Sequence, residues 1–467
     1  DGRAALGVVG ISTNGQLNTT IDLASPALSL TTTGSNSSAL MSLGSSLGTG
    51  ATAIDIGGGD AILATSGTSA HAIVAGLQSQ QAAASLQVGL AGDRISVDTS
   101  GDSSWGAVAF ASSGLDEGLA ELDLSGAATR ITTSGQNAGG AMINANGATG
   151  SLAKLRLSGA ASGVSTSNSG SSGAILTATG PGESKAHAVL SGAAATIKTQ
   201  GTGSAALLLS ATGARSNVDV DLSGAASAIT TAGQSAGGVL AAAHGVDQAG
   251  IALRLSGAGS NITTVGGDAS AALVTAIAER AQISLSMSGQ GTSISTSGDN
   301  SAGFAGTAIG ASEAVAKAIL SGASARISTT GANSVGAALT AIATDPDSTA
   351  RAELALTGSG GGIETSGANS SAAVLTAAEA RISVGKGARL ATSGTASHAA
   401  LIVADSATVE IGPGGVVTTG QADSVGLFFV NVAGQNLVVN QGGLATAGSA
   451  IVSAGGLRFT NHGSAVS

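Results

Sequence analysis

The stretch Leu122-Asp-Leu-Ser-Gly-Ala-Ala-Thr-Arg-Ile-Thr-Thr-Ser-Gly135 contains the signals that decide the fold. Its end is one copy of a pentapeptide in which an aliphatic residue, a threonine and a glycine alternate with other residues. Fifteen copies run along the chain, and their threonines are Thr13, Thr32, Thr65, Thr99, Thr133, Thr166, Thr199, Thr231, Thr264, Thr296, Thr329, Thr365, Thr392, Thr418 and Thr446. A motif that recurs from one end to the other predicts a single stacked repeat array.

The motif glycine returns every 32 to 34 residues between Gly34 and Gly331. Asn168 replaces it in one copy. Asparagine and glycine are the residues that best tolerate a left-handed backbone, so we expect that conformation at this position. A second glycine, such as Gly126, precedes the motif glycine by nine residues in eight repeats.

Apolar residues alternate with polar ones at a period of two, which is typical of strands, and no helical pattern is visible. Leu122-Asp-Leu124, Ile131-Thr-Thr133 and Ala174-Ile-Leu176 represent three short strands in each repeat. Strands that end in glycine turns and recur about every 33 residues indicate one triangular coil per repeat. The sequence therefore predicts an all-β parallel β-helix, a solenoid of about fifteen coils.

The same alternation places Ile131 and Thr133 on one face of their strand. Because the aliphatic residue faces the core, the threonine is expected to face it too. Stacked coils would align these residues in an internal ladder, in which each hydroxyl bonds to a neighbouring coil because a buried hydroxyl needs a partner. The ladder is predicted at Thr133, Thr166, Thr199, Thr231, Thr264, Thr296 and Thr329.

The composition and charge of the chain limit the classes of function that it can have. Hydrophobic residues make up 43% of the chain and are placed periodically, which argues against disorder. The net charge of −10 disfavours binding to nucleic acid or to an anionic membrane. Cysteine is absent and no run of about 18 apolar residues occurs. We expect a mature, soluble piece whose export signals lie outside it, without cofactor or metal.

Repeat spacing divides the solenoid into three segments. Residues 1–367 carry repeats of about 33 residues, 368–419 carry shorter coils, and 420–467 hold larger apolar residues such as Phe428, Phe429 and Phe459. Terminal coils of a solenoid need capping, so the last segment is interpreted as a cap.

Catalytic patterns lack the context they need. Gly233-Gln-Ser235-Ala-Gly237 matches a nucleophile elbow, but that elbow requires a following helix. His71 and His398 occupy the same slot of different coils and do not converge on one site. The acidic pairs Glu121/Asp123 and Asp219/Asp221 have no aromatic residue nearby to stack on a sugar. We predict a non-enzymatic protein, with a polysaccharide-acting β-helix enzyme as an alternative.

Trp105 is the only tryptophan, and it shares the loop slot after the motif glycine with His71. Interfaces concentrate their energy in aromatic and arginine side chains. We therefore predict partner binding at Trp105, His71 and Asp102, with an outward-pointing ring. The alternative is a ring folded over the apolar edge of the next coil.

Cysteine-free repeats rich in glycine, alanine, serine and threonine, ending in a more apolar block, resemble the passenger domain of a bacterial autotransporter (type V secretion) of the pertactin-like sort. The resemblance covers the full chain. It implies a right-handed β-helix exported through the periplasm and outer membrane, at the cell surface or secreted. Residues 420–467 resemble the folding core, and a translocator barrel is expected outside this chain.

Passengers of this kind commonly bind host proteins. We expect a monomer that captures a soluble serum protein, such as a complement regulator, for immune evasion. The alternative is an adhesin that binds host cells or matrix.

Overall fold

The computed structural model describes residues 4–13, 15–430 and 434–466. These residues form an all-β parallel solenoid of about 13 turns without a helix, and its short sheet has fifteen strands. The predicted fold class is thus confirmed, with a turn count close to the fifteen coils expected. The chain divides into two compact units, Asp1–Val246 and Asp247–Ser467, which use the same coil.

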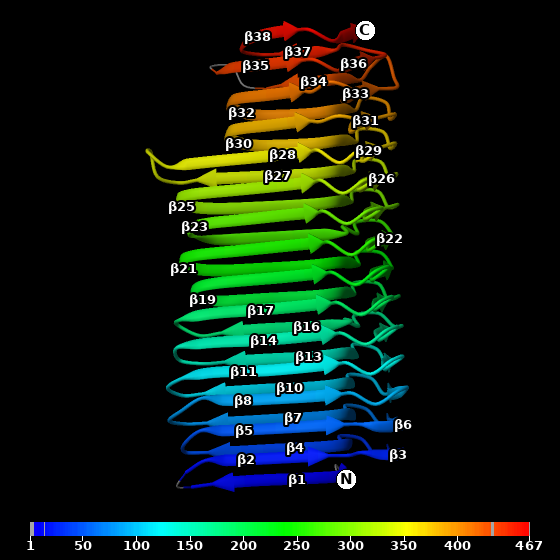
Figure 1. Ribbon diagram of the computed structural model, residues 1–467, viewed down its shortest axis with the longest axis vertical. Coiled ribbons are helices and arrows are strands. Elements are labelled where there is room, and N and C mark those ends of the chain that lie inside the picture. The colour runs from blue at the N-terminus through cyan, green and yellow to red at the C-terminus, as the bar shows by residue number, and fades with distance from the viewer. Residues whose placement is uncertain (1–3, 14, 431–433, 467) are drawn as a thin grey trace. The chain divides into compact units, whose positions relative to one another are not determined.

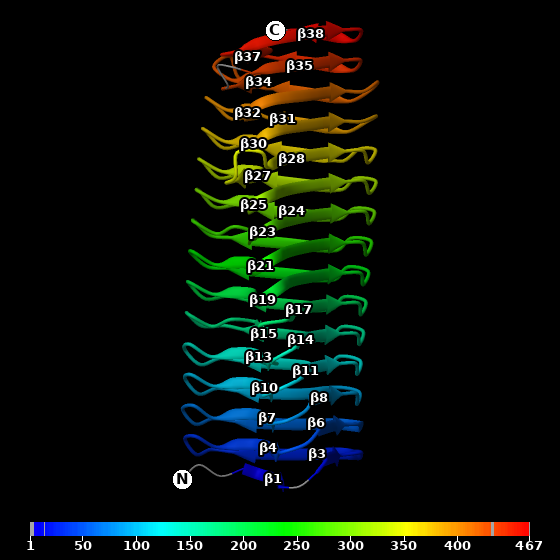
Figure 2. The ribbon, with the colours of Figure 1, turned by 90° about the vertical axis from the view of Figure 1, so that its left-hand side faces the viewer.

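Unit 1, Asp1–Val246, has three faces of parallel strands. The first face, seen stacked in Figure 2, consists of β1 (Ala4–Ser12), β4 (Ser38–Ser46), β7 (His71–Ser79), β10 (Trp105–Ser113), β13 (Gly139–Asn146), β16 (Ala174–Thr179) and residues 205–212 of β19 (Ala205–Leu222). The second face, seen in Figure 1, consists of β2 (Leu17–Asp22), β5 (Gly50–Ile56), β8 (Ala84–Leu90), β11 (Glu117–Leu124), β14 (Gly150–Leu157), β17 (Glu183–Leu190) and the rest of β19. The third face consists of β3 (Ser25–Thr32), β6 (Gly58–Thr65), β9 (Ile95–Thr99), β12 (Arg130–Thr133), β15 (Gly163–Thr166), β18 (Thr196–Thr199) and β20 (Ala228–Ala232). The boundary between the units falls within β21 (Gly237–Leu255).

Unit 2, Asp247–Ser467, repeats this plan, with several strands that continue from the first face onto the second. The continuous strands are β23 (Ala272–Met287), β25 (Ala302–Leu320), β30 (Ser371–Val384) and β32 (His398–Ile411). The other strands of these two faces are β27 (Val335–Ala343), β28 (Thr349–Leu356), β34 (Val425–Phe429), β35 (Gln435–Asn440), β37 (Ile451–Ser453) and β38 (Gly456–Asn461). The third face consists of β22 (Asn261–Val265), β24 (Ser293–Thr296), β26 (Arg326–Thr329), β29 (Gly362–Thr365), β31 (Arg389–Thr392), β33 (Val416–Thr419), β36 (Gly443–Thr446) and β39 (Ser464–Val466).

Each strand lies in register on the same strand of the next coil, as in the pairing of Ile131 with Val164 and of Thr133 with Thr166. The aliphatic member of the motif points inward and is buried in most copies, as at Leu63, Ile131 and Ile327, whereas Ile11 in the first copy is exposed. Phe304 is fully buried as well. The core of each unit is therefore a stack of aliphatic layers, one layer for each coil.

The motif threonines face this core as predicted, and all seven predicted ladder residues are buried. The predicted bonds between coils are wrong. Thr166, Thr231 and Thr264 donate to the carbonyl five residues ahead in their own coil, at 2.9 to 3.4 Å. Thr133, Thr199, Thr296 and Thr329 have no hydrogen-bond partner among the described residues. In these three coils the acceptor is the carbonyl of the threonine's own turn. Thr392, which is not among the seven predicted residues, donates to the preceding coil at the carbonyl of Ser370, 3.3 Å away.

A serine five residues after the threonine connects the coils instead. The N–H of Ser301 donates to Ser334 Oγ at 3.2 Å, and Ser334 Oγ donates to the carbonyl of Gly298 at 3.1 Å. The same pair of bonds joins Ser370 to the turn that contains Gly331 and Ser334, at 3.0 and 2.9 Å. Each serine hydroxyl therefore satisfies two buried backbone groups of the preceding coil, which would otherwise be costly.

The motif glycine is needed for close stacking, and the predicted left-handed conformation at this position is wrong in every described copy except Gly266, with φ of 143°. Gly135 is absent from the residues with positive φ, and the left-handed residue is Asn137, with φ of 52°. A Cβ added at Gly135 would overlap the carbonyl oxygen of Gly101 in the preceding coil. Asn168, which replaces the glycine in one copy, donates from Nδ2 to the carbonyl of Ser134.

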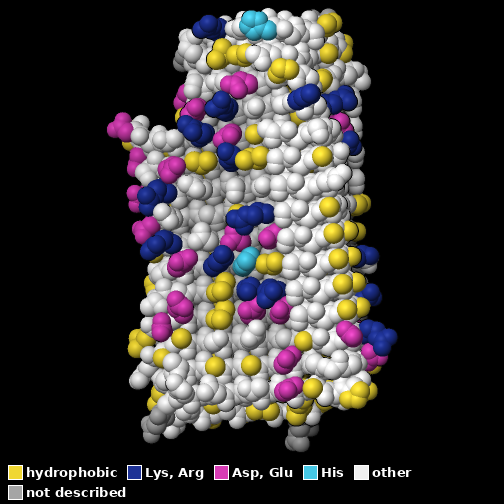
Figure 3. Space-filling model, viewed as in Figure 1, with side chains coloured by type: hydrophobic (Ala, Val, Ile, Leu, Met, Phe, Trp, Pro, Cys, Tyr) yellow, Lys and Arg dark blue, Asp and Glu magenta, His cyan; other side chains and the backbone are white. Residues whose placement is uncertain are grey.

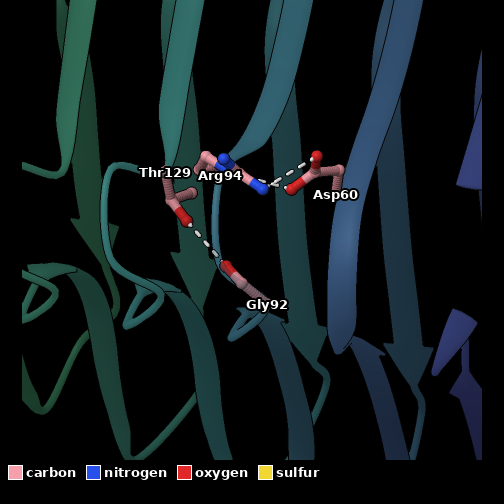
Figure 4. Close-up of polar contacts among 4 residues, drawn as sticks. All are labelled: Asp60, Gly92, Arg94 and Thr129. Carbon is pink, nitrogen blue, oxygen red and sulfur yellow. Dashed lines mark hydrogen bonds and ion pairs between the residues drawn. The ribbon is translucent and has the colours of Figure 1, made fainter. Parts of the chain in front are cut away.

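The second glycine turn stacks in the same way (Figure 4). A Cβ at Gly126 would overlap the carbonyl oxygen of Gly92. Thr129 Oγ1 donates to that same carbonyl at 3.2 Å. Beside this turn, Arg94 binds both carboxylate oxygens of Asp60 in the preceding coil, at 2.9 and 3.1 Å. Both turns of the repeat are thus held coil against coil.

In two copies of the motif, the threonine named from the sequence does not occupy the ladder position on the third face. Thr13 follows β1, which belongs to the first face, so this copy is not part of the threonine ladder. In β33 the residue that pairs with Thr392 and Thr446 is Thr419 and not Thr418. Two adjacent threonines precede Gly420, and the backbone pairing selects the second.

The segment 420–467 continues the same three faces. Phe429 is buried, whereas Leu457 and Phe459 on β38 are exposed. Residues 431–433 of this segment lie outside the described residues. Its large apolar side chains are therefore divided between the core and the surface.

Candidate functional site

Charge is distributed unequally between the faces of unit 1. The first-face strands β1, β4, β7, β10, β13 and β16 and residues 205–212 contain no Asp, Glu, Lys or Arg. The second-face strands β11, β14 and β17 carry both signs of charge, which Figure 3 shows gathered on that side. The first face of unit 1 is called the uncharged face below.

The second-face charges pair between coils. Lys154 Nζ lies 3.1 Å from Glu121 Oε1, and Arg156 Nη1 lies 3.5 Å from Asp123 Oδ2. Lys185 Nζ lies 2.8 Å from Asp219 Oδ2 in the following coil. The acidic residues that share a strand face, as predicted, are thus part of a ladder of ion pairs. Such partly exposed pairs contribute little stability each.

The outward side of the uncharged face carries a continuous apolar column. Consecutive coils pair one large aliphatic residue with the next, in the order Met41, Val74, Val108, Met142, Ile175 and Leu208. These side chains face solvent, yet most are only partly exposed because each covers its neighbours in the column. A contiguous apolar patch on a soluble surface is typical of an interaction site.

Two aromatic residues flank this column on β10. Phe110 is exposed, and its ring lies over Gly76 of the preceding coil, where a Cβ would overlap it. Trp105 is half-buried, and its ring lies over Gly139 of the next coil in the same way. The expectation of a fully outward ring is therefore wrong, since a glycine in the next coil leaves room for the ring to lie flat. The alternative, a ring folded over the next coil, describes its position.

His71 and Trp105 lie in adjacent coils at equivalent positions beside the column, so the structure brings these two predicted residues together. The backbone N–H of Trp105 donates to His71 Nδ1 at 3.0 Å. Burial lowers the pKa of His71 below its usual value of 6.5. The imidazole is thus kept neutral and holds the start of β10 through its unprotonated nitrogen.

Asp102 has a different position from the other two residues. It lies in the exposed turn before β10, and its Oδ1 accepts a hydrogen bond from the Gln136 N–H at 2.8 Å. This contact ties the turn to the next coil. Asp102 therefore borders the uncharged face and supports a turn, without being part of the apolar column.

Unit 2 has a weaker version of this surface. Its outward column contains Leu273, Ala305, Ala338, Val374, Leu401 and Phe428. The two alanines interrupt the column of large side chains. His398 occupies the slot of His71, its ring lies 5.0 Å from that of Phe428, and burial lowers its pKa too.

Sequence reasoning selected Trp105 and His71 but missed Val108, Phe110 and Met142. The distribution of charged residues along the sequence contains a signal for this face. In unit 1 the strands that follow the motif turn lack charge, whereas most of the strands that come next along the chain, such as β11, β14 and β17, carry charges. A count of charged residues by strand, aligned on the motif, distinguishes this face in the sequence itself.

Among the described residues, no group of three or more His, Cys, Asp or Glu is placed to hold a metal ion. The part of the chain that the structure describes also contains no helix long and apolar enough to cross a membrane.

Comparison with known proteins finds no match. No family model, no curated protein and no solved structure matches the sequence or the structure. The chain is a long parallel β-solenoid protein.

Proposed function

We propose that the chain is the passenger domain of a bacterial autotransporter that binds a host protein without catalysis. It would be displayed at the cell surface or secreted. The cysteine-free repeats and the parallel solenoid support the passenger assignment. The observation that carries the binding role is the uncharged face of unit 1, with its apolar column beside Trp105 and Phe110.

The surface suits a protein partner for two physical reasons. Burying the column removes apolar area from water without desolvating a charge, and the lack of charge avoids the cost of unpaired ions. The Trp105 ring already lies over Gly139, so little rotamer freedom is lost when a partner covers it. The partner we propose is a soluble serum protein, such as a complement regulator.

The experiment is a pull-down from human serum with the immobilised chain, compared with a Val108→Lys variant. Val108 is in the centre of the apolar column and is half-exposed. An ammonium group there would be buried against an apolar partner, which is strongly unfavourable. The matched control is Val374→Lys, which places the same charge at the same half-exposed position of the column in unit 2.

A stoichiometric serum protein that is lost with Val108→Lys and kept with Val374→Lys would support the proposal. Equal binding by the parent chain and both variants would exclude the uncharged face as the site. If serum yields no protein but the parent chain binds epithelial cells and Val108→Lys does not, the adhesin alternative is favoured. Thermal unfolding of each variant checks that the fold is unchanged.

A further inference from the structure

The third face of unit 2 has a shallow hollow of about 290 Å³. Its walls come from β26, β29, β31 and the turns that follow them. Nearly all of the lining residues are polar, and they include Ser328, Thr330, Glu364, Ser366, Arg389 and Ser393. The hollow is separate from the uncharged face of unit 1, and nothing about it depends on the function proposed above.

Two arginines lie at this hollow: Arg389 lines it, and Arg326 lies at its edge beside Glu364, which is part of the lining. Arg326 pairs with Gly362 in the next coil, and Gly362 pairs with Arg389 in the coil after that. The two arginines are therefore two strand spacings apart, about 10 Å. Because Gly362 has no side chain, no side chain of this column separates the two arginines. We call the space between Arg326, Gly362 and Arg389 the arginine notch.

One carboxylate is shared by both arginines. Glu364 Oε2 lies 3.7 Å from Arg326 Nη1, and Glu364 Oε1 lies 3.9 Å from Arg389 Nη1. Both contacts are too long for a charge-assisted hydrogen bond, which is closer to about 2.8 Å. By contrast, Arg351 and Glu379 in the same unit form a pair at 2.9 Å.

The arginine notch therefore has two positive charges and one negative charge, in a chain whose net charge is −10. Both arginine side chains are more than half exposed. Their planar donors match carboxylate and sulfate groups, and the loose contacts with Glu364 leave most of these donors free to bind such a group.

We propose that the arginine notch binds an acidic oligosaccharide, with a carboxylate or sulfate group held between Arg326 and Arg389. The hydroxyls of Ser328, Thr330 and Ser366 bond to sugar hydroxyls, and Glu364 accepts from another. A small inorganic anion gains less, because Glu364 repels it and it cannot use the hydroxyls. A peptide fits poorly because the lining has few apolar side chains for its own to pack against.

The test is titration calorimetry of the full chain with a galacturonate tetramer and with a heparin-derived tetrasaccharide. The first probe carries carboxylates alone and the second adds sulfates, so the two probes separate the sources of charge. Maltotetraose, which is uncharged, and inorganic sulfate are the reference ligands. We expect saturable binding of at least one acidic tetrasaccharide, with no comparable binding of either reference.

Variants locate the site. Arg326→Gln and Arg389→Gln should each weaken binding roughly tenfold or more, since each removes charged hydrogen bonds. The matched control is Arg130→Gln, because Arg130 has the same place in its coil but faces Ser96 and Gly163 and no second arginine. Glu364→Gln should tighten binding severalfold, because it removes the competing carboxylate.

Three results would overturn the proposal. These are the absence of saturable binding by both acidic tetrasaccharides, equal binding of maltotetraose or inorganic sulfate, and equal weakening by Arg130→Gln. Circular dichroism of each variant confirms that these exposed substitutions leave the fold intact. Failure here has no bearing on the serum experiment, because Val108 and the arginine notch belong to different units.

Discussion

At the scale of single residues, the two hydroxyl residues of the repeat have different roles. The motif threonine is buried. Among the predicted ladder residues, those that form a hydrogen bond donate within their own coil, and the others have no partner among the described residues. The serine five residues later links its coil to the preceding one. The threonine therefore acts mainly as a small β-branched packing residue, while the serine satisfies backbone groups of the turn.

Replacing Ser334 tests this difference. Ser334→Ala leaves one buried N–H and one buried carbonyl of the preceding coil without a partner. We expect the free energy of unfolding to fall by about 2 kcal/mol. Urea unfolding measures the change, and Ser328→Ala, at a partly exposed position of the neighbouring strand, is the control with little expected effect. An equal effect of both substitutions would contradict the assignment.

The two half-buried histidines predict how stability depends on pH. Burial lowers the pKa values of His71 and His398 in the folded state below 6.5. The unfolded chain therefore binds more protons once the pH falls through about 6.5, so their contribution is present above that pH and is lost below it. We expect the urea midpoint to decrease between about pH 7.5 and about pH 5.5.

The double variant His71→Gln/His398→Gln is the control for this decrease. It lacks both titrating groups, so its midpoint should change less over the same interval. A decrease as large as that of the parent chain would mean that other groups cause the pH dependence.

At the scale of structural elements, the glycine turn determines how closely two coils can stack. Gly135 and Gly298 are required because a Cβ would overlap the carbonyl oxygen of the preceding turn. The left-handed residue falls two positions later, at Asn137 and Asn300, where asparagine tolerates positive φ. Spacing in the sequence locates the turn correctly. It does not distinguish the position that must lack a Cβ from the position that must adopt a positive φ.

A pair of glycine substitutions tests the stacking argument. Gly135→Ala forces the new methyl group into the Gly101 carbonyl, so we expect a loss of at least about 2 kcal/mol in unfolding free energy. Gly267 lies in the equivalent turn of another coil, and a Cβ there meets no atom within 4 Å. Gly267→Ala should be nearly neutral in the same urea experiment. Comparable destabilisation by both would show that overlap with the stacked turn is not the cause.

At the scale of the whole molecule, the main feature is the segregation of charge between faces in each unit. The first-face strands of unit 1 and the first-face residues 272–278 and 302–310 of unit 2 lack charge, while the second and third faces hold ion pairs such as Lys317 with Glu353 and Arg326 with Glu364. This arrangement provides two kinds of surface on one fold. One kind suits apolar contacts and the other suits polar ligands.

Salt separates the two kinds of binding. Raising sodium chloride from about 0.05 M to about 0.5 M shortens the Debye length severalfold. Binding of the serum partner to the uncharged face should change little, whereas binding of an acidic oligosaccharide at the arginine notch should weaken markedly. Surface plasmon resonance at both salt concentrations measures each affinity. Serum-partner binding that collapses at high salt would argue against the uncharged face.

The sequence alone determined the solenoid class, the inward threonines and the turns, because these depend on a period along the chain. Only the tertiary structure showed that Trp105 lies over Gly139, that Ser334 links two coils and that Arg326 and Arg389 flank Gly362. These relations join residues about one or two coils apart in the stack. They depend on the register between coils and on the space each side chain finds there, which a period along one strand does not specify.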